Sequence, residues 1–268
     1  MGNWLHRIRF IGKYLQYYLT ASNGKGHGTH SPFVFGFIKQ VLNDQNIYPS
    51  YGKVEALRKK LKKDRRMISV EDLGAGTTTG AGHQRSISSI ATHAAKPPKY
   101  AQLLFRMARY YQAQRILELG TSLGLTSAYL AQANENGKLL TLEGAPSIAE
   151  LAALHFNQLQ LENVEVITGN FDQTLLPALE KLGRPDMVFV DGNHRKEPTL
   201  RYFKTLLGHA GPETILIFDD IHWSREMEEA WEEIRLDPAV QCSLDLFFIG
   251  IVFFRKEFRE KVHFTIRY

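Results

Sequence analysis

Short apolar runs alternate with helical segments through the second half of the chain. The runs have five or six residues, and the segments after them carry apolar residues at helical spacing. The runs occupy 115–119, 138–143, 164–168, 186–191 and 214–219, and the helical segments 126–132, 147–159, 175–182, 198–207 and 225–236. Strands and helices that alternate in this way form βαβ units, whose strands lie parallel in one sheet. The pattern therefore predicts an α/β fold built on a mostly parallel sheet.

The pattern changes near the end of the chain. Residues 243–255 are strand-like and rich in aromatic side chains, and 263–268 form a final strand-like run. The segment 256–261 between them is too short for a long crossover helix, so we expect the two runs to form an antiparallel pair at the edge of the sheet. Added to the five runs before them, they predict a sheet of seven strands.

Residues 1–99 are predicted to be mainly helical. An apolar stripe at helical spacing, which we expect to pack within the protein rather than on a membrane surface, runs through Trp4, Ile8, Ile11, Leu15 and Tyr18. Pro32 suits the first turn of a helix over 33–42. We therefore divide the chain into a helical extension, 1–99, and a domain over 100–268. The extension is expected to serve as a lid, a substrate-binding region or a homodimer contact.

Charge separates the same two regions. Residues 1–100 hold 16 Lys and Arg against 5 Asp and Glu, a net charge of +11. The whole chain holds 33 and 28, so residues 101–268 hold 17 and 23, a net charge of −6. A single cysteine, Cys242, excludes an internal disulfide and favours a cytoplasmic location. No uninterrupted apolar run reaches the roughly 18 residues that a membrane-spanning helix needs.

The strongest candidate for chemistry is a Gly-rich turn after the strand 115–119. It reads Glu118-Leu-Gly-Thr-Ser-Leu-Gly-Leu-Thr126 and leads into a helix. Its glycines let the backbone approach a ligand, and the N-terminus of the helix offers free N–H groups. The candidate binding residues of this turn are Glu118, Gly120, Ser122, Gly124 and Thr126.

A carboxylate at the end of the next strand strengthens this prediction. Glu143 lies 19 residues after Gly124, where an acid can accept hydrogen bonds from both hydroxyls of a ribose. A second Gly-rich segment, 71–80, is not followed by a strand that ends in an acid. We interpret it as a connector, or as a loop that folds over a ligand. The turn and Glu143 together indicate a site for a nucleotide-like ligand.

Three further acids end the next two strands. Asp191 follows one strand, and Asp219 and Asp220 end the other. In a parallel sheet all three belong to the edge where ligands bind, and such carboxylates repel one another unless a cation lies between them. Oxygen ligands of this kind suit Mg²⁺ or another divalent cation; the simpler interpretation is helix capping and solvent exposure. His194 and His222 follow these acids, and either could act as a general base.

The basic run 58–66 permits several interpretations. It reads Arg-Lys-Lys-Leu-Lys-Lys-Asp-Arg-Arg, with no aromatic residue for base stacking. A solvated helix face is favoured over contact with an anionic membrane or with RNA.

The residues from about 100 to 254 resemble a class I S-adenosylmethionine-dependent methyltransferase. The turn 118–126 resembles the first cofactor motif of that class, and Glu143 resembles the acid that holds the ribose. Asp186-Met-Val-Phe-Val-Asp191 is similar to the pattern of catechol and caffeoyl-CoA O-methyltransferases. That resemblance implies a Rossmann-like fold and a divalent metal held by Asp191 and by Asp219-Asp220, which stands where those families have Asp-Asn.

A second resemblance concerns the proposed base. Asp191-Gly-Asn-His194 is similar to macrocin-type sugar O-methyltransferases, in which a histidine three residues after the metal aspartate is the proposed base; this favours His194 over His222. Gly169, Asn170 and Phe171 stand where such enzymes contact adenine. The segment 25–35 resembles an N-terminal extension found in methyltransferases of Bacteroidetes-type bacteria.

The resemblance implies a metal-assisted O-methyltransferase that uses S-adenosyl-L-methionine to methylate a hydroxyl group of a small molecule. Asp191, His194 and His222 would serve catalysis, and Asp191 would also lie beside the cofactor. The alternatives are an RNA-directed or metal-independent methyltransferase, or a binding module without catalysis. A nucleic-acid methyltransferase usually carries Asn/Asp-Pro-Pro-aromatic after its fourth strand, where this chain has Asp-Gly-Asn-His. Contact with a membrane surface and a homodimer remain open, as does the identity of the acceptor.

Overall fold

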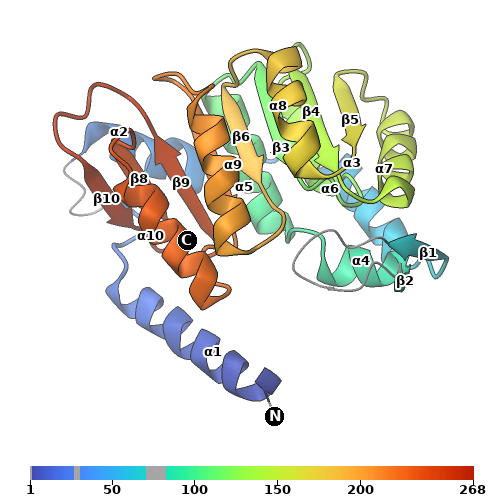
Figure 1. Ribbon diagram of the computed structural model, residues 1–268, viewed down its shortest axis with the longest axis horizontal. Helices are drawn as coiled ribbons and strands as arrows, with labels where there is room; N and C mark the ends of the chain where they lie inside the picture. Colours follow the sequence, from blue (N-terminus) through green and yellow to red (C-terminus); the bar gives the residue numbers. More distant parts are fainter. Residues whose placement is uncertain (1, 27–30, 71–82) are drawn as a thin grey trace.

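A computed structural model describes residues 2–26, 31–70 and 83–268 of the protein (Figure 1). The Gly-rich segment over 71–82 lies outside the described residues, and with it the expectation of a ligand-covering loop. The described part is built around one eight-stranded sheet with the order β10-β8-β9-β7-β6-β3-β4-β5. Its strands are β3 Arg115–Leu119, β4 Lys138–Glu143, β5 Val164–Thr168, β6 Met187–Val190, β7 Ile215–Asp219, β8 Cys242–Asp245, β9 Ile249–Phe253 and β10 Val262–Thr265.

Helices cover both faces of this sheet (Figure 1). Side chains alternate along each strand, so that Leu117 and Leu119 of β3 face one layer while Ile116 faces the other. The first layer holds α8 Phe171–Leu182, α9 Lys196–Leu207 and α10 Arg225–Leu236. The second layer holds α5 Pro98–Tyr110, α6 Leu125–Ala133 and α7 Pro146–Gln158. The predicted α/β architecture with a mostly parallel sheet is therefore confirmed.

The predicted strand number is wrong, and the antiparallel pair near the C-terminal edge is formed by other segments than predicted. The apolar stretch 243–255 is two strands, β8 and β9, which form an antiparallel hairpin. The chain reverses at Phe247, which has a φ of 68° and whose N–H donates to Asp245. β10 then lies parallel to β8, so β9 alone runs against the other seven strands of this sheet. A turn made of Leu-Phe-Phe has no glycine or proline to mark it, and the hydrophobic pattern therefore shows one long strand.

The extension packs its shorter helices into the same core as the sheet. These are α2 Pro32–Phe37, continued by a π-helical turn over Ile38–Leu42, α3 Pro49–Leu61 and α4 Ile87–His93. Pro32 occupies the first turn of α2, as predicted, and Ser31 caps this helix. A two-stranded sheet, β1 Met67–Val70 with β2 His83–Ser86, lies beside α4 (Figure 1). The boundary at residue 99 remains a prediction.

The long helix α1, Gly2–Thr20, lies apart from the other helices and reaches the domain through one face (Figure 1). Phe10, Tyr14 and Tyr17 pack against the aromatic turn of β8–β9. The predicted packing stripe is wrong where its side chains are described, because four of them are exposed: Ile8, Ile11, Leu15 and Tyr18. Trp4 lies outside the described side chains. The two stripes are about a third of a turn apart on the helix, and the sequence pattern alone does not separate them.

Two other features of the extension bear on the sequence predictions. None of the helices in the described ranges is long and apolar enough to cross a membrane. Of the basic run 58–66, Arg58 is buried beside Glu55, and the other basic side chains are exposed. This exposure is consistent with the solvated-face interpretation.

Candidate active site

A pocket of about 300 Å³ opens at the carboxyl ends of β3, β4 and β6. The sequence prediction placed a ligand at this edge, and seven of the predicted residues line the pocket: Gly120, Ser122, Glu143, Asn170, Phe171, Asp191 and His194. The extension contributes four residues that the sequence analysis missed, Val70, Arg85, Ile90 and Ala94. No local motif marks these four, because only the packing of α4 and β1–β2 brings them to the sheet edge.

The Gly-rich turn after β3 is shaped by its first glycine. Gly120 has a φ of 106°, and a Cβ at this position would lie 1.9 Å from the carbonyl oxygen of Asp191. Neither the backbone conformation nor the space admits a side chain. The turn is thereby held close against the end of β6, and the floor of the pocket is backbone rather than side chain.

Glu143 is held by two backbone N–H groups. The N–H of Ser122 donates to Oε2 at 2.8 Å, and the N–H of Ala145 donates to Oε1 at 3.0 Å. A carboxylate oxygen has two lone pairs, so each oxygen retains one acceptor site. Two adjacent acceptor sites match the two neighbouring hydroxyls of a ribose. Burial raises the pKa of Glu143 above its ordinary value, although hydrogen bonds from backbone N–H groups oppose the shift.

Glu118 and Thr126 are buried and do not line the pocket. Glu118 is fully buried and accepts hydrogen bonds from the hydroxyls of Ser127 and Thr141. Burial raises the pKa of Glu118 to about 7. Gly124, also predicted as a binding residue, begins α6 with a φ of 76° and meets the ring of Phe156. Of the predicted residues of this turn, only Gly120 and Ser122 line the pocket.

The turn between β5 and α8 forms another wall of the pocket. Asn170 caps α8, its side chain accepting from the N–H of Asp172 at 2.9 Å. Phe171 packs on Gly192 and lies 6.1 Å from the ring of Tyr202. Gly169, with a φ of 144°, sets the direction of this turn without lining the pocket. An aromatic ring beside a polar turn is a suitable surface for a planar base.

The acidic cluster contains a cation that the sequence analysis missed. Lys96 lies between α4 and α5, and its Nζ contacts Asp219 Oδ2 and lies 3.9 Å from Asp191 Oδ2. Its side chain is 9% exposed and that of Asp219 1%. Asp219 Oδ1 is buried and has no hydrogen-bond partner in the ranges that the structure describes. The two strand ends are thus joined through an ammonium group from the extension.

Electrostatics in this cluster follow from burial. Burial and the neighbouring carboxylate of Asp219 raise the pKa of Asp191, and Lys96 opposes the shift. Burial and Asp219 also raise the pKa of Asp220 to about 7. The pKa of Lys96 is raised, because the carboxylates outweigh the effect of burial. Lys96 is therefore a permanent positive charge at neutral pH.

The predicted metal site does not fit this arrangement. Among the side chains that the structure describes, no three of His, Cys, Asp or Glu come together as ligands for a metal ion. Asp191 and Asp219 approach each other, but Lys96 lies between them. A divalent ion there would need metal–oxygen distances of about 2.0–2.6 Å and would have to displace the ammonium group. We therefore derive no chemical step through a metal.

The two candidate histidines have different surroundings. His194 lines the pocket, and its Nε2 lies 3.5 Å from Asp191 Oδ1. Burial lowers the pKa of His194, so its ring is neutral at pH 7 and can accept a proton. Its φ of 36° places it in a strained turn with Asn193, a conformation that is common at functional sites.

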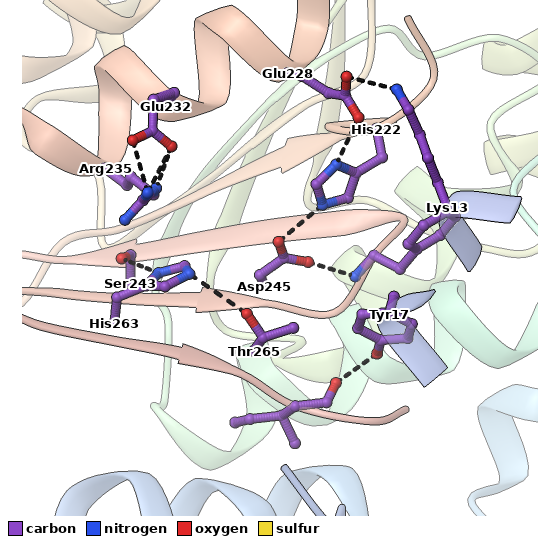
Figure 2. Close-up of polar contacts among 12 residues, drawn as sticks. Lys13, Tyr17, His222, Glu228, Glu232, Arg235, Ser243, Asp245, His263 and Thr265 are labelled. Carbon is purple, nitrogen blue, oxygen red and sulfur yellow. Dashed lines mark hydrogen bonds and ion pairs between the residues drawn. The ribbon is translucent and has the colours of Figure 1, made fainter. Parts of the chain in front are cut away.

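His222 does not line the pocket, and its ring contacts two carboxylates, Glu228 and Asp245 (Figure 2). Its Nε2 lies 2.8 Å from Asp245 Oδ2 and its Nδ1 3.4 Å from Glu228 Oε1, and Glu228 also pairs with Lys13 of α1. Burial lowers the pKa of His222, but the two carboxylates outweigh it and raise the pKa. Both ring nitrogens of His222 are engaged, and His222 is linked to α1 through Glu228. His194 is therefore the better candidate base.

The comparisons with known proteins agree with this geometry. Residues 117–221 match a methyltransferase domain family. The chain is 32% identical to a catechol O-methyltransferase of Niastella koreensis over 147 residues, which are 54% of this chain and 64% of that protein. It is 31% identical to a catechol O-methyltransferase of Mycobacterium tuberculosis over 144 residues, 49% of this chain and 61% of that protein. The chain thus covers less than two thirds of the length of these relatives.

Solved structures extend the comparison. The O-methyltransferase TomG of Streptomyces achromogenes, determined with S-adenosylmethionine, is 26% identical, with a TM-score of 0.52 over 60% of this chain and 82% of TomG. A methyltransferase of Podospora anserina bound to S-adenosylhomocysteine shares the fold, with a TM-score of 0.60, 15% identity and coverage of 84% and 97%.

The sheet, the Gly-rich turn and the acid that follows it have the arrangement of a class I S-adenosylmethionine-dependent methyltransferase, and residues 117–221 match a methyltransferase domain. Within this class, the relatives that the chain resembles are O-methyltransferases. The resemblance stated from the sequence is confirmed.

Proposed function

We propose that the chain transfers the methyl group of S-adenosylmethionine to a hydroxyl group of a small molecule. The observation that carries this proposal is that one pocket is lined both by Glu143 with its two free acceptor sites and by the pair Asp191–His194. A cofactor cradle and a base beside it are the two elements that methyl transfer to a hydroxyl requires.

The fit of the cofactor rests on the turn after β3. A Cβ on Gly120 would fill the space beside Asp191, and Glu143 presents acceptors for the ribose hydroxyls. Phe171 and Asn170 form the wall proposed for adenine. When bound, S-adenosylmethionine supplies an electrophilic methyl group on a sulfonium. The remaining work of the protein is to position the acceptor and to remove its proton.

His194 is the proposed base. It is neutral at pH 7 because burial lowers its pKa, and it lines the pocket. A proton taken from the acceptor hydroxyl would make its ring cationic, and Asp191 lies 3.5 Å away to stabilise that charge. The catalytic role proposed for Asp191 is therefore electrostatic, and Lys96 and Asp219 hold its carboxylate in place.

The acceptor is proposed to be a hydroxylated small molecule with an apolar or aromatic body. Val70, Ile90 and Ile148 line the pocket together with Tyr202. The acceptors named for the relatives are catechols, so catechol is the first probe. We also propose a cytoplasmic location, since Cys242 is a free, buried cysteine. Contact with a membrane surface through the exposed stripe of α1 and a homodimer stay predictions.

The test has two parts. Calorimetric titration with S-adenosylhomocysteine measures cofactor binding, and S-adenosylmethionine with catechol measures turnover by mass spectrometry of the product. Binding with turnover that is lost in His194→Gln supports the proposal. Binding without turnover on any hydroxylated probe favours a non-catalytic binding module, and methylation of RNA instead of catechol favours the RNA-directed alternative. No binding refutes the proposal.

A further inference from the structure

Lys96 enters the acidic cluster from a segment with a fixed backbone. The N–H groups of Ala94 and Ala95 close onto the carbonyl of Ile90 at the end of α4. Pro97 and Pro98 follow, and α5 begins at Pro98. A proline restricts both its own φ and the conformation of the residue before it, here Lys96. The Lys96 side chain therefore leaves a backbone with little freedom, unlike that of an ordinary surface lysine.

The destination of this side chain is the space between two strand ends. Nζ contacts Asp219 Oδ2 at the end of β7 and lies 3.9 Å from Asp191 Oδ2 after β6. The exposed fraction of the Lys96 side chain, 9%, lies between that of Asp219, 1%, and that of Asp191, 19%. A charged group in such surroundings is retained only where it is paired, because removal of one partner leaves the other charge buried and uncompensated.

A metal bound by the same two carboxylates would occupy the same space. Its bonds to oxygen would be about 2.0–2.6 Å long, shorter than the ion-pair distance between Nζ and Asp191. An ammonium group and a divalent cation also repel each other strongly at such separations. The two cations therefore exclude one another, and Lys96 is attached to the chain whereas a metal must be bound from solution.

We propose that the ammonium group of Lys96 is the resident cation of this site, and that it excludes a divalent metal from the space between Asp191 and Asp219. Lys96 acts through those carboxylates and is a positioning residue: it holds Asp191 beside His194 without a metal. This role in methyl transfer rests on the proposed function. The occupancy of the site by Lys96 does not rest on it, and it can be tested without an acceptor.

The experiment is a calorimetric titration of Mn²⁺ into the full chain, first loaded with S-adenosylhomocysteine. We compare the wild-type protein with Lys96→Ala, in which the space and both carboxylates become free. Lys99→Ala is the control, because Lys99 is a neighbouring exposed lysine whose Nζ lies 4.2 Å from the ring of Tyr268. A double variant, Lys96→Ala with Asp219→Asn, tests whether any new metal binds at the vacated position.

The proposal predicts no saturable Mn²⁺ binding at the cluster in the wild-type protein or in Lys99→Ala. Lys96→Ala should gain one site, at least about tenfold tighter than any wild-type binding, and lose it again in the double variant. Mg²⁺ should likewise raise the melting temperature of Lys96→Ala and leave that of the wild type unchanged. If Lys96→Ala does not fold, Lys96→Met keeps the length and removes only the charge.

A single result on the wild-type protein is enough to overturn the proposal. Stoichiometric Mn²⁺ binding by the wild-type protein that disappears in Asp219→Asn would mean that Lys96 yields its place to a metal. It is equally overturned if folded Lys96→Ala or Lys96→Met binds no more Mn²⁺ than the wild type. Failure of the proposed function has a separate signature, because it appears as absent binding of S-adenosylhomocysteine in the loading step.

Discussion

Replacement of Glu143 by glutamine should weaken the binding of S-adenosylhomocysteine by about 100-fold. The N–H groups of Ser122 and Ala145 already occupy one acceptor site on each carboxylate oxygen, leaving one site on each oxygen for a ribose hydroxyl. A glutamine side chain keeps one oxygen, without charge, and turns its amino group toward a backbone donor. A hydrogen bond to a charged group contributes about 1.5–3 kcal/mol.

The expected size follows from these two hydrogen bonds. One is lost outright and the other loses the assistance of charge, which together cost about 3 kcal/mol. Since about 1.4 kcal/mol corresponds to a tenfold change in affinity, the dissociation constant should rise by about two orders of magnitude. The wild-type affinity should also fall as the pH is lowered through the raised pKa of Glu143, because a protonated carboxyl loses acceptor sites. Glu143→Gln should show no such pH dependence.

The assay is calorimetric titration with S-adenosylhomocysteine, supported by circular dichroism to establish folding. Asp186→Asn is the matched control: this carboxylate also accepts two backbone N–H groups, from Gln114 and Arg115, but at the opposite edge of the sheet. It should leave the affinity within a factor of about two. The reasoning is refuted if folded Glu143→Gln binds within about threefold of the wild type, or if the control loses as much.

Three further predictions concern the base, the buried acid and the turn. His194→Gln should lower kcat by about 10²–10⁴ and leave the affinity for S-adenosylhomocysteine unchanged, and wild-type kcat should fall as the pH drops through the lowered pKa of His194; a flat pH profile would exclude this base. Glu118 has a pKa of about 7 in the folded protein against about 4.5 when unfolded, so it binds its proton more tightly in the folded state. As the pH rises between these two values, the protein should therefore lose about 3 kcal/mol of stability in total. Chemical denaturation at several pH values should show that the free energy of unfolding of Glu118→Gln, relative to the wild type, rises between these two pKa values and stays constant above them. A relative free energy of unfolding that does not change with pH would contradict the assignment. Gly120→Ala should abolish cofactor binding, whereas Gly183→Ala, with a φ of 76° and open space around it, should cost only modest stability; equal affinity for S-adenosylhomocysteine in both variants would refute the steric argument.

The parts of the site that could be predicted from the sequence are those set by local pattern. Each parallel strand is a short apolar run, and a ligand-binding residue at its carboxyl end is only one or two positions away in the chain. Gly120 and Glu143 could be found for this reason. The parallel order of the strands alone determines the edge of the sheet at which Gly120 and Glu143 meet.

Lys96 could not be predicted in this way. It lies 95 positions before Asp191 and 123 before Asp219, outside the βαβ pattern, and next to prolines that indicate only a turn. His222 is the converse case: its neighbours in sequence suggested catalysis, while its ring contacts Asp245 and Glu228, which lie elsewhere in the chain. Contacts between distant segments settle the charge balance of a buried cluster, and hydrophobic periodicity carries no information about them.

The junction between α1 and β10 has a consequence for the order of folding. Tyr17 donates to the carbonyl of Ile266, which lies 249 positions later, and Ser22 is bridged to the same strand end. Ribosomes add about 5–20 residues per second, so α1 waits roughly ten seconds to a minute for these partners. Until then, both of its apolar stripes face water, a state that chaperones recognise. α1 is synthesised early but can dock only after β10 has been synthesised, so its docking should be the last step of folding.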